Sequence, residues 1–189
     1  ITKPALGKDK YYRILPLKRY TEADILIRQT APHPIAAVHT EPSYFRNSAL
    51  AYFHIMPHLN SSIVACAILN SWVVRFYFIN SFIDLQQKSF PQIKISQLMD
   101  MPLPLMPVDI RLTLQIINLA QTFVKSEAAR KAKLLIDLNC IIALLYGLTE
   151  RETELISENI PETGGYDVNS HFKSVAKKYG ELLPPNNRM

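Results

Sequence analysis

The chain has 189 residues, of which 48% are hydrophobic and 20% are charged. These proportions exclude a disordered chain and predict a domain of ordinary size with a substantial apolar core. Thirteen prolines against five glycines indicate stiff loops, with few of the glycine turns that hold nucleotide phosphates.

The net charge of +5 is concentrated in the first half of the chain. Residues 1–94 hold eleven Lys and Arg against five Asp and Glu, a net charge of +6. Residues 95–189 hold ten against eleven, a net charge of −1. A basic half beside a balanced half predicts a polyanionic partner for the first half.

Cysteine content and chain start bear on the cellular setting. Cys66 and Cys140 lie in apolar helical patterns, which predicts small buried side chains rather than a disulfide framework or a metal site. The chain starts at Ile1 without a basic-then-apolar leader, and we expect a segment of a longer, cytoplasmic protein. Polar residues interrupt the longest apolar run, 63–83, so no membrane helix is expected there.

The first 20 residues interleave lysines and arginines with tyrosines, and their two prolines argue against a continuous helix. Two interpretations stay open for this segment. It contacts nucleic-acid phosphates, or it is a solvated linker to a preceding domain. In the first interpretation the contacting residues are Lys8, Lys10, Tyr11, Arg13, Lys18 and Arg19.

Short β-rich segments follow at 24–30, 34–40 and 48–56. The apolar stretch 61–80 is then expected to be helical, with Ser61 or Ser62 as its N-cap. The alternation Ile-Lys-Ile predicts a last short strand at 93–95. Together these elements predict a small mixed β-sheet with packed helices.

Prolines at 102, 104 and 107 mark a boundary between residues 1–107 and a helical segment, residues 108–189. The predicted fold class is therefore α+β. Asp109 is positioned to cap a long helix that Gly147 ends. A capping box of Thr149 and Glu152 begins a short helix, and a basic amphipathic helix ends at Gly180.

Five short segments carry a family resemblance by their order and spacing. They are ILIRQT (25–30), NSALAY (47–52), ILNS (68–71), FPQIKISQLMDMPLP (90–104) and IDLNCIIALLYGLTERE (136–152). In this order they resemble the TaqI-like C-terminal specificity domain of type IIG restriction-modification enzymes and N6-adenine DNA methyltransferases. The resemblance implies an α+β domain that recognises double-stranded DNA. It also implies an N-terminal methyltransferase or nuclease domain in the same polypeptide, which would bind S-adenosylmethionine and flip the target adenine.

No catalytic motif accompanies these segments. The sequence lacks an Asn/Asp-Pro-Pro-aromatic tetrapeptide, and 184–186 reads Pro-Pro-Asn, which is the wrong order. No glycine-rich cofactor loop follows a predicted strand. His54 and His58 have helical spacing, but Pro57 between them breaks the geometry of a metal site. We therefore expect no catalysis, cofactor or metal in this segment by itself.

Side chains at strand ends and in loops are the candidates for DNA contact. Arg28 and Arg46 are able to bond a guanine edge bidentately, and for both a scaffold role stays equally open. Arg75 follows the ILNS motif on the same helix. Gln87 and Lys88 lie in the connection before the predicted last strand, where DNA contact and plain solvation are equally favoured.

The remaining patterns favour structural roles. For the aromatic residues between 72 and 82, core packing is favoured over base stacking. Lys173 and Lys177 on the terminal helix would bind a phosphate backbone, although a solvated helix is the simpler interpretation. The long helix has an apolar stripe that needs a partner. A protein-interaction module, using this helical half, is therefore the competing hypothesis. The aromatic residues are Trp72, Phe76, Tyr77, Phe78 and Phe82.

Overall fold

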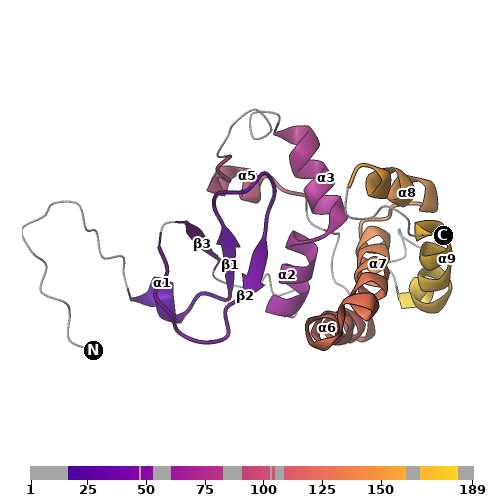
Figure 1. The fold of residues 1–189 in the computed structure, drawn as a ribbon, viewed down its shortest axis with the longest axis horizontal. Coiled ribbons are helices and arrows are strands. Elements are labelled where there is room, and N and C mark those ends of the chain that lie inside the picture. The colour runs from indigo at the N-terminus through magenta and orange to yellow at the C-terminus, as the bar shows by residue number, and fades with distance from the viewer. Residues whose placement is uncertain are drawn as a thin grey trace, which may run out of the picture.

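A small sheet, two middle helices and a set of C-terminal helices succeed one another along the long axis of the molecule (Figure 1). The computed structural model describes residues 17–46, 48–52, 61–82, 91–102, 104, 109–160 and 167–182, without the side chain of Arg19. This arrangement confirms the α+β class. The elements are α1 (Lys18–Thr21), β1 (Ile25–Arg28), β2 (Ala36–Val38), β3 (Ala49–Tyr52), α2 (Ser62–Leu69), α3 (Trp72–Ser81), α5 (Ile95–Met99), α6 (Ile110–Lys125), α7 (Ala128–Leu145), α8 (Glu150–Glu158), α9 (Val168–Tyr179) and the 3₁₀ turn Gly180–Leu182.

The sheet has the order β2–β1–β3, and both pairings are antiparallel. The expected mixed sheet is therefore wrong for the described strands, which form an antiparallel sheet. An apolar pattern shows which residues face the core, but it does not show whether neighbouring strands run parallel or antiparallel. Ile25 and Ile27 are buried on one face of β1. Alternation places Leu26 and Arg28 on the opposite face.

The helix expected over 61–80 is two helices, α2 and α3, bent by 48°. Ser61 caps α2, and its hydroxyl accepts a backbone N–H at 3.1 Å, which confirms one of the two expected caps. Asn70 ends α2, and Ser71 caps α3 by accepting a backbone N–H at 3.3 Å. The Asn-Ser pair of the ILNS motif therefore ends one helix and begins the next.

The α2–α3 pair is the most apolar part of the fold. No single described helix is long and apolar enough to cross a membrane, and this pair meets the criterion only when both members are counted across their bend. Val64, Ile68, Trp72 and Phe78 are buried in the core. The core packing predicted for the aromatic segment is confirmed at the last two of these residues.

The strand predicted at 93–95 is wrong. Gln92 forms only an isolated bridge with Thr30, and α5 begins at Ile95. Ile93 is buried, whereas Ile95 is 63% exposed, so the two isoleucines do not share a face as they would in a strand. The Lys94 N–H donates to the Gln97 side chain at 2.8 Å, which begins the helix instead.

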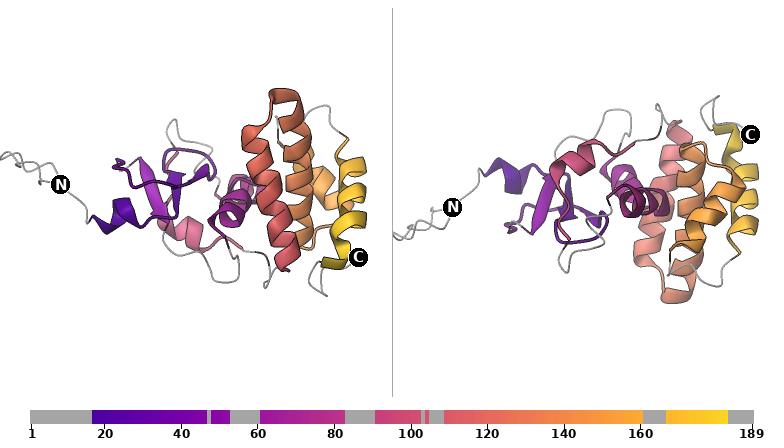
Figure 2. Two further views of the ribbon diagram at one scale, coloured as in Figure 1. Left: turned by 90° about the horizontal axis from the view of Figure 1, so that it is seen from below. Right: turned by 90° about the horizontal axis from the view of Figure 1, so that it is seen from above.

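The long helix expected from Asp109 to Gly147 is divided into α6 and α7, which lie side by side (Figure 2). The Ser126 hydroxyl donates to the Thr122 carbonyl oxygen at 2.7 Å, and this local bond marks the end of α6. The expected ends are confirmed. The Asp109 carboxylate accepts a backbone N–H of α6 at 2.8 Å, and Gly147 has a φ of 73° after α7.

The middle helices are joined to the C-terminal helices through a buried amide. The Asn139 side chain on α7 is 2% exposed. Its Oδ1 accepts the Trp72 N–H at 2.7 Å, and its Nδ2 donates to the Leu135 carbonyl oxygen at 2.8 Å. One buried core extends from the sheet to α9. The domain boundary at residue 107 stays a prediction, since 105–108 lie outside the described residues.

Candidate nucleic-acid interface

The end of the sheet at which β1 finishes brings together cationic residues from separate segments. Arg28, the last residue of β1, faces Ala49, the first residue of β3. The Ala49 N–H donates to the Arg46 carbonyl oxygen at 3.1 Å, which holds Arg46 beside the same strand end. The sequence-predicted residues Arg28 and Arg46 therefore lie at one site. We call this end of the sheet, with Arg28, Arg46 and Lys94, the basic edge.

Lys94 joins the basic edge through the backbone just before α5. The Ile93 N–H donates to the Gln29 carbonyl oxygen at 2.8 Å, and the Thr30–Gln92 bridge lies beside it. Lys94 is exposed. Lys94 was not among the residues predicted from the sequence to contact DNA, because its place depends on pairing between residues far apart in the chain. The predicted strand at 93–95 was the only local signal of that pairing.

The basic edge is positive and open. The side chains of Arg28, Arg46 and Lys94 are exposed, and within the described residues none of them has an ion-pair partner. The chain has no Asp or Glu in 28–36, 46–49 or 91–94. Such an edge attracts phosphates, and exposed guanidinium groups have the fork geometry that bonds phosphate or guanine.

Several alanines neighbour the exposed Arg28 in the sheet. In the observed register, Ala49 is paired with Arg28, while Ala37 and Ala51 are paired with Leu26. Paired residues in an antiparallel sheet share a face, so these alanines lie on the same face as Arg28. Leu26 and Ile35 are larger neighbours, and the Arg28 side chain itself stays exposed to a ligand.

Asn70 anchors the strand that leads away from the basic edge. Its Oδ1 accepts the Ala36 N–H at 3.0 Å, and its Nδ2 donates to the Ala36 carbonyl oxygen at 2.9 Å and the Cys66 carbonyl oxygen at 2.8 Å. These bonds pair the outer edge of β2 with the end of α2. They also hold the β1–β2 connection, which starts at Arg28. Asn70 is thus a positioning residue for the basic edge.

Replacing Asn70 with alanine is expected to lower the free energy of unfolding by about 1–2 kcal/mol, because its exposed hydrogen bonds to Ala36 and Cys66 are lost together. Asn80→Ala is the matched control, since Asn80 is exposed on α3 and its side chain donates to the Phe76 carbonyl oxygen of its own helix at 2.8 Å. Urea unfolding of both variants measures the difference. Equal stability of the two variants would show that the Asn70 bonds to β2 contribute nothing.

The other predicted contact residues have varied positions. Lys18, on α1, forms an exposed ion pair with Glu22 at 3.3 Å, and such a pair adds little stability. Arg19 lies on α1, and Arg75 is half-buried on α3. The remaining candidates of the first half lie outside the described residues and stay predictions. They are Lys8, Lys10, Tyr11, Arg13, Gln87 and Lys88.

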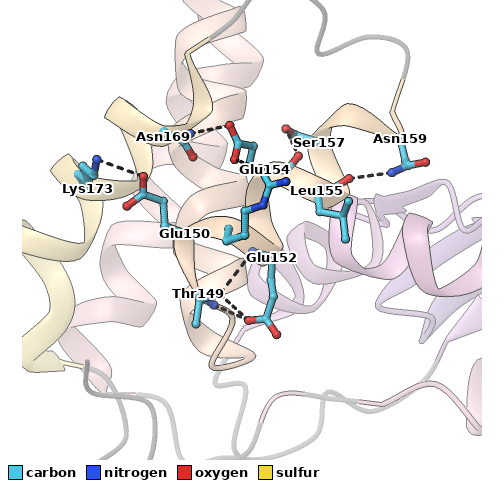
Figure 3. Close-up of polar contacts among 10 residues, drawn as sticks. Thr149, Glu150, Glu152, Glu154, Leu155, Ser157, Asn159, Asn169 and Lys173 are labelled. Carbon is cyan, nitrogen blue, oxygen red and sulfur yellow. Dashed lines mark hydrogen bonds and ion pairs between the residues drawn. The ribbon is translucent and has the colours of Figure 1, made fainter.

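Lys173 and Lys177 lie on α9, at the opposite end of the molecule from the sheet (Figure 1). Lys173 connects α9 to α8 through an ion pair with Glu150 at 3.1 Å, and beside it Asn169 donates to Glu154 at 2.6 Å (Figure 3). The structure does not bring these lysines to the basic edge. Their contact with DNA stays a prediction and would need a second, separate surface.

The predicted capping box at the start of α8 is confirmed. Glu152 Oε2 accepts the Thr149 backbone N–H and the Thr149 hydroxyl, each at 2.8 Å (Figure 3). These hydrogen bonds, the backbone one foremost, lower the pKa of Glu152. Because the folded pKa lies below the unfolded one, this contribution is present above the ordinary pKa of about 4.3. It is lost as the pH falls through the folded value.

Glu152→Gln is therefore expected to be less stable than the unmodified chain at pH 7, and the difference should shrink as the pH falls below about 4. Urea unfolding at neutral and acidic pH measures it. Glu158→Gln, on the same helix but outside the capping box, controls for the general loss of a charge. A difference that stays constant with pH would contradict the assignment of this bond to the carboxylate.

Neither thiol has the environment of a reactive cysteine. Both cysteines are free, with Cys140 buried and Cys66 partly buried. Burial is the main cause that raises the pKa of Cys66 to about 11 and that of Cys140 to about 12, so both thiols are protonated at neutral pH.

Within the described residues no three His, Cys, Asp or Glu side chains form a metal-binding group. His54 and His58 lie outside that part of the chain.

The α+β fold presents two arginines and a lysine at one end of its sheet, an arrangement that suits an anionic partner. The sequence model of the TaqI-like C-terminal specificity domain matches residues 4–103, which is more than half of the chain. The chain therefore belongs to the TaqI-like C-terminal specificity domain family. This confirms the resemblance and indicates DNA recognition in restriction-modification enzymes. No curated protein and no solved structure matches the chain.

Proposed function

We propose that this chain is the target-recognition domain of an adenine-specific DNA methyltransferase or a fused type IIG restriction enzyme. The observation that carries this proposal is the family match over residues 4–103, the part of the chain that contains the basic edge. By itself the domain binds double-stranded DNA and does no chemistry. An N-terminal methyltransferase or nuclease domain of the same polypeptide would use S-adenosylmethionine, in the cytoplasm of a bacterium.

In this proposal the basic edge meets the duplex. Arg28 projects from the open face of the sheet and is the residue best placed to read a guanine edge. Arg46 and Lys94 neutralise phosphates on either side of it and fix the register of the domain. The basic, tyrosine-containing residues 1–20 add phosphate contacts to the same half of the chain.

Selection from randomised duplexes at two salt concentrations tests the proposal. The purified chain is expected to retain duplexes that share a short motif, with an affinity that falls steeply as salt is added. Salt-sensitive retention without a motif would place specificity in the catalytic half. Absence of retention at low salt would contradict DNA binding by this chain.

A protein-interaction module is the second candidate, and the outer face of α6 favours it. Ile110, Leu114 and Val124 are 58%, 56% and 72% exposed on this helix. They continue the apolar stripe predicted from the sequence. A partner helix or domain would cover them, and its binding would change little with added salt, in contrast to DNA binding. The same salt comparison therefore separates the two functions.

A further inference from the structure

A second polar site lies among the C-terminal helices, away from the basic edge. A cavity of about 290 Å³ opens between α7 and α9, with α6 beside it. Its polar lining comprises two lysines, one histidine, one aspartate and two serines. These residues are Lys133, Asp137, Ser170, His171, Ser174 and Lys178.

His171 is held in a fixed orientation at this cavity. Its Nδ1 lies 2.7 Å from Asp137 Oδ1, and both side chains are 24% exposed. An ionised carboxylate only accepts hydrogen bonds, so Nδ1 carries a proton and donates to Asp137. Nε2 is then the ring nitrogen left for a ligand. Because Asp137 already accepts this hydrogen bond from His171, it does not require a positively charged group of the ligand as its partner.

The charge of the cavity is positive. Lys133 enters from α7 and Lys178 from α9, and within the described residues neither is ion-paired to a carboxylate. Lys178 Nζ lies 4.9 Å from the centre of the Tyr179 ring, which keeps it near the cavity. Asp137 is the only carboxylate among the described lining residues. Two ammonium groups against one engaged carboxylate favour an anionic ligand.

The size of the cavity narrows the choice of anion. Pockets for drug-sized ligands and cofactors have volumes of roughly 300–1,000 Å³, so this one lies at the lower limit and suits a small group. A tetrahedral phosphate accepts several hydrogen bonds at once, which matches ammonium groups and a hydroxyl converging from two helices. Ser174 supplies a hydroxyl from α9, one helical turn from Lys178.

We propose that this cavity binds a phosphate group, held by Lys133, Lys178 and the Ser174 hydroxyl, with His171 Nε2 as a further hydrogen-bonding atom. The phosphate comes from the DNA backbone or from a free phosphate or phosphomonoester. The site does not depend on the basic edge, so it extends beyond the recognition function proposed above.

Titration of the ¹⁵N-labelled chain with inorganic phosphate tests the site, with sodium chloride at matched ionic strength as the salt control. We expect saturable shifts of amide signals on α7 and α9, around residues 133–137 and 171–178. Lys133→Gln and Lys178→Gln should each weaken this binding about tenfold or more. Lys125→Gln is the matched control, because Lys125 is an exposed lysine at the end of α6, outside the cavity lining, and its replacement should leave the affinity unchanged.

Three results would overturn the proposal. They are shifts that do not saturate, equal effects of Lys125→Gln and Lys178→Gln, and shifts that sodium chloride reproduces. A second titration, with a short DNA duplex, identifies the source of the phosphate. Shifts of the same signals that inorganic phosphate competes away assign the site to the DNA backbone. Saturable shifts with phosphate alone assign it to a free phosphate or phosphomonoester. The phosphate titration involves no DNA, so its failure would leave the recognition function untouched.

Discussion

Replacing Asn139 with alanine is expected to lower the free energy of unfolding by about 2–3 kcal/mol. The change removes the acceptor of the Trp72 N–H and leaves this donor unsatisfied inside the core, which costs about 1–3 kcal/mol. It also removes the bond to the Leu135 carbonyl oxygen and opens a small cavity. The higher helix propensity of alanine offsets up to about 0.7 kcal/mol of this loss. Urea unfolding measures the result.

Asn118→Ala is the matched control for this prediction. Asn118 is an exposed asparagine on α6, so the same substitution there tests helix propensity alone and should raise stability slightly. If the two variants were equally stable, the buried amide would contribute nothing to the junction of α3 and α7. A stability loss confined to Asn139→Ala would establish that this one side chain connects the middle helices to the C-terminal ones.

The double variant Arg28→Gln with Arg46→Gln is expected to bind the selected duplex about 100-fold more weakly. Loss of a bidentate contact from Arg28 to a base costs about 1–3 kcal/mol, and loss of the Arg46 phosphate contact adds to it, which together gives an effect of this size. Phosphate contacts predict a second signature, in which each lost contact lowers the slope of log affinity against log salt by about 1. Fluorescence anisotropy at several salt concentrations measures both quantities and separates base contact from phosphate contact.

Arg130→Gln serves as the control for the DNA experiment. Arg130 is exposed near the start of α7, outside the basic edge, and its removal lowers the net charge by the same amount per residue. We expect little change in affinity from it. All three arginines are exposed, so each substitution should change stability by less than about 0.5 kcal/mol. If Arg130→Gln weakened DNA binding as much as the double variant does, the affinity would depend on the total charge of the chain and not on the basic edge.

Residues 1–20 and the connection that contains Gln87 and Lys88 are also predicted to contact DNA. The basic edge provides a site against which the contribution of this connection can be compared. Phe82 and Pro91 flank that connection, and Pro91 lies just before the Thr30–Gln92 bridge. Gln87→Ala and Lys88→Ala belong in the same anisotropy series. Weaker DNA binding by either variant would show that the connection contributes to the same surface as Arg28, Arg46 and Lys94.

The sequence by itself determined the local structure, above all where helices begin and end. Asp109, Gly147 and the Thr149–Glu152 box mark helix ends correctly, because each acts on backbone groups within about four residues. The strands around Ile25 and Leu50 follow from short β-rich runs between turn residues. The family resemblance follows from the order of short segments, which needs no knowledge of their contacts, and the family match over residues 4–103 leaves the segment 136–152 untested.

Contacts between distant residues are what only the tertiary structure decided. Asn70, at the bend between α2 and α3, bonds to Ala36 of β2, whereas the apolar residues alone predict one continuous helix. Ile93 bonds to Gln29 without extending a strand, which brings Lys94 to the basic edge. The cavity lined by Lys133 and Lys178 exists because α7 and α9 pack together. Propensity acts over a few residues, whereas a binding surface is assembled by pairing and packing across the whole chain, which a linear pattern does not record.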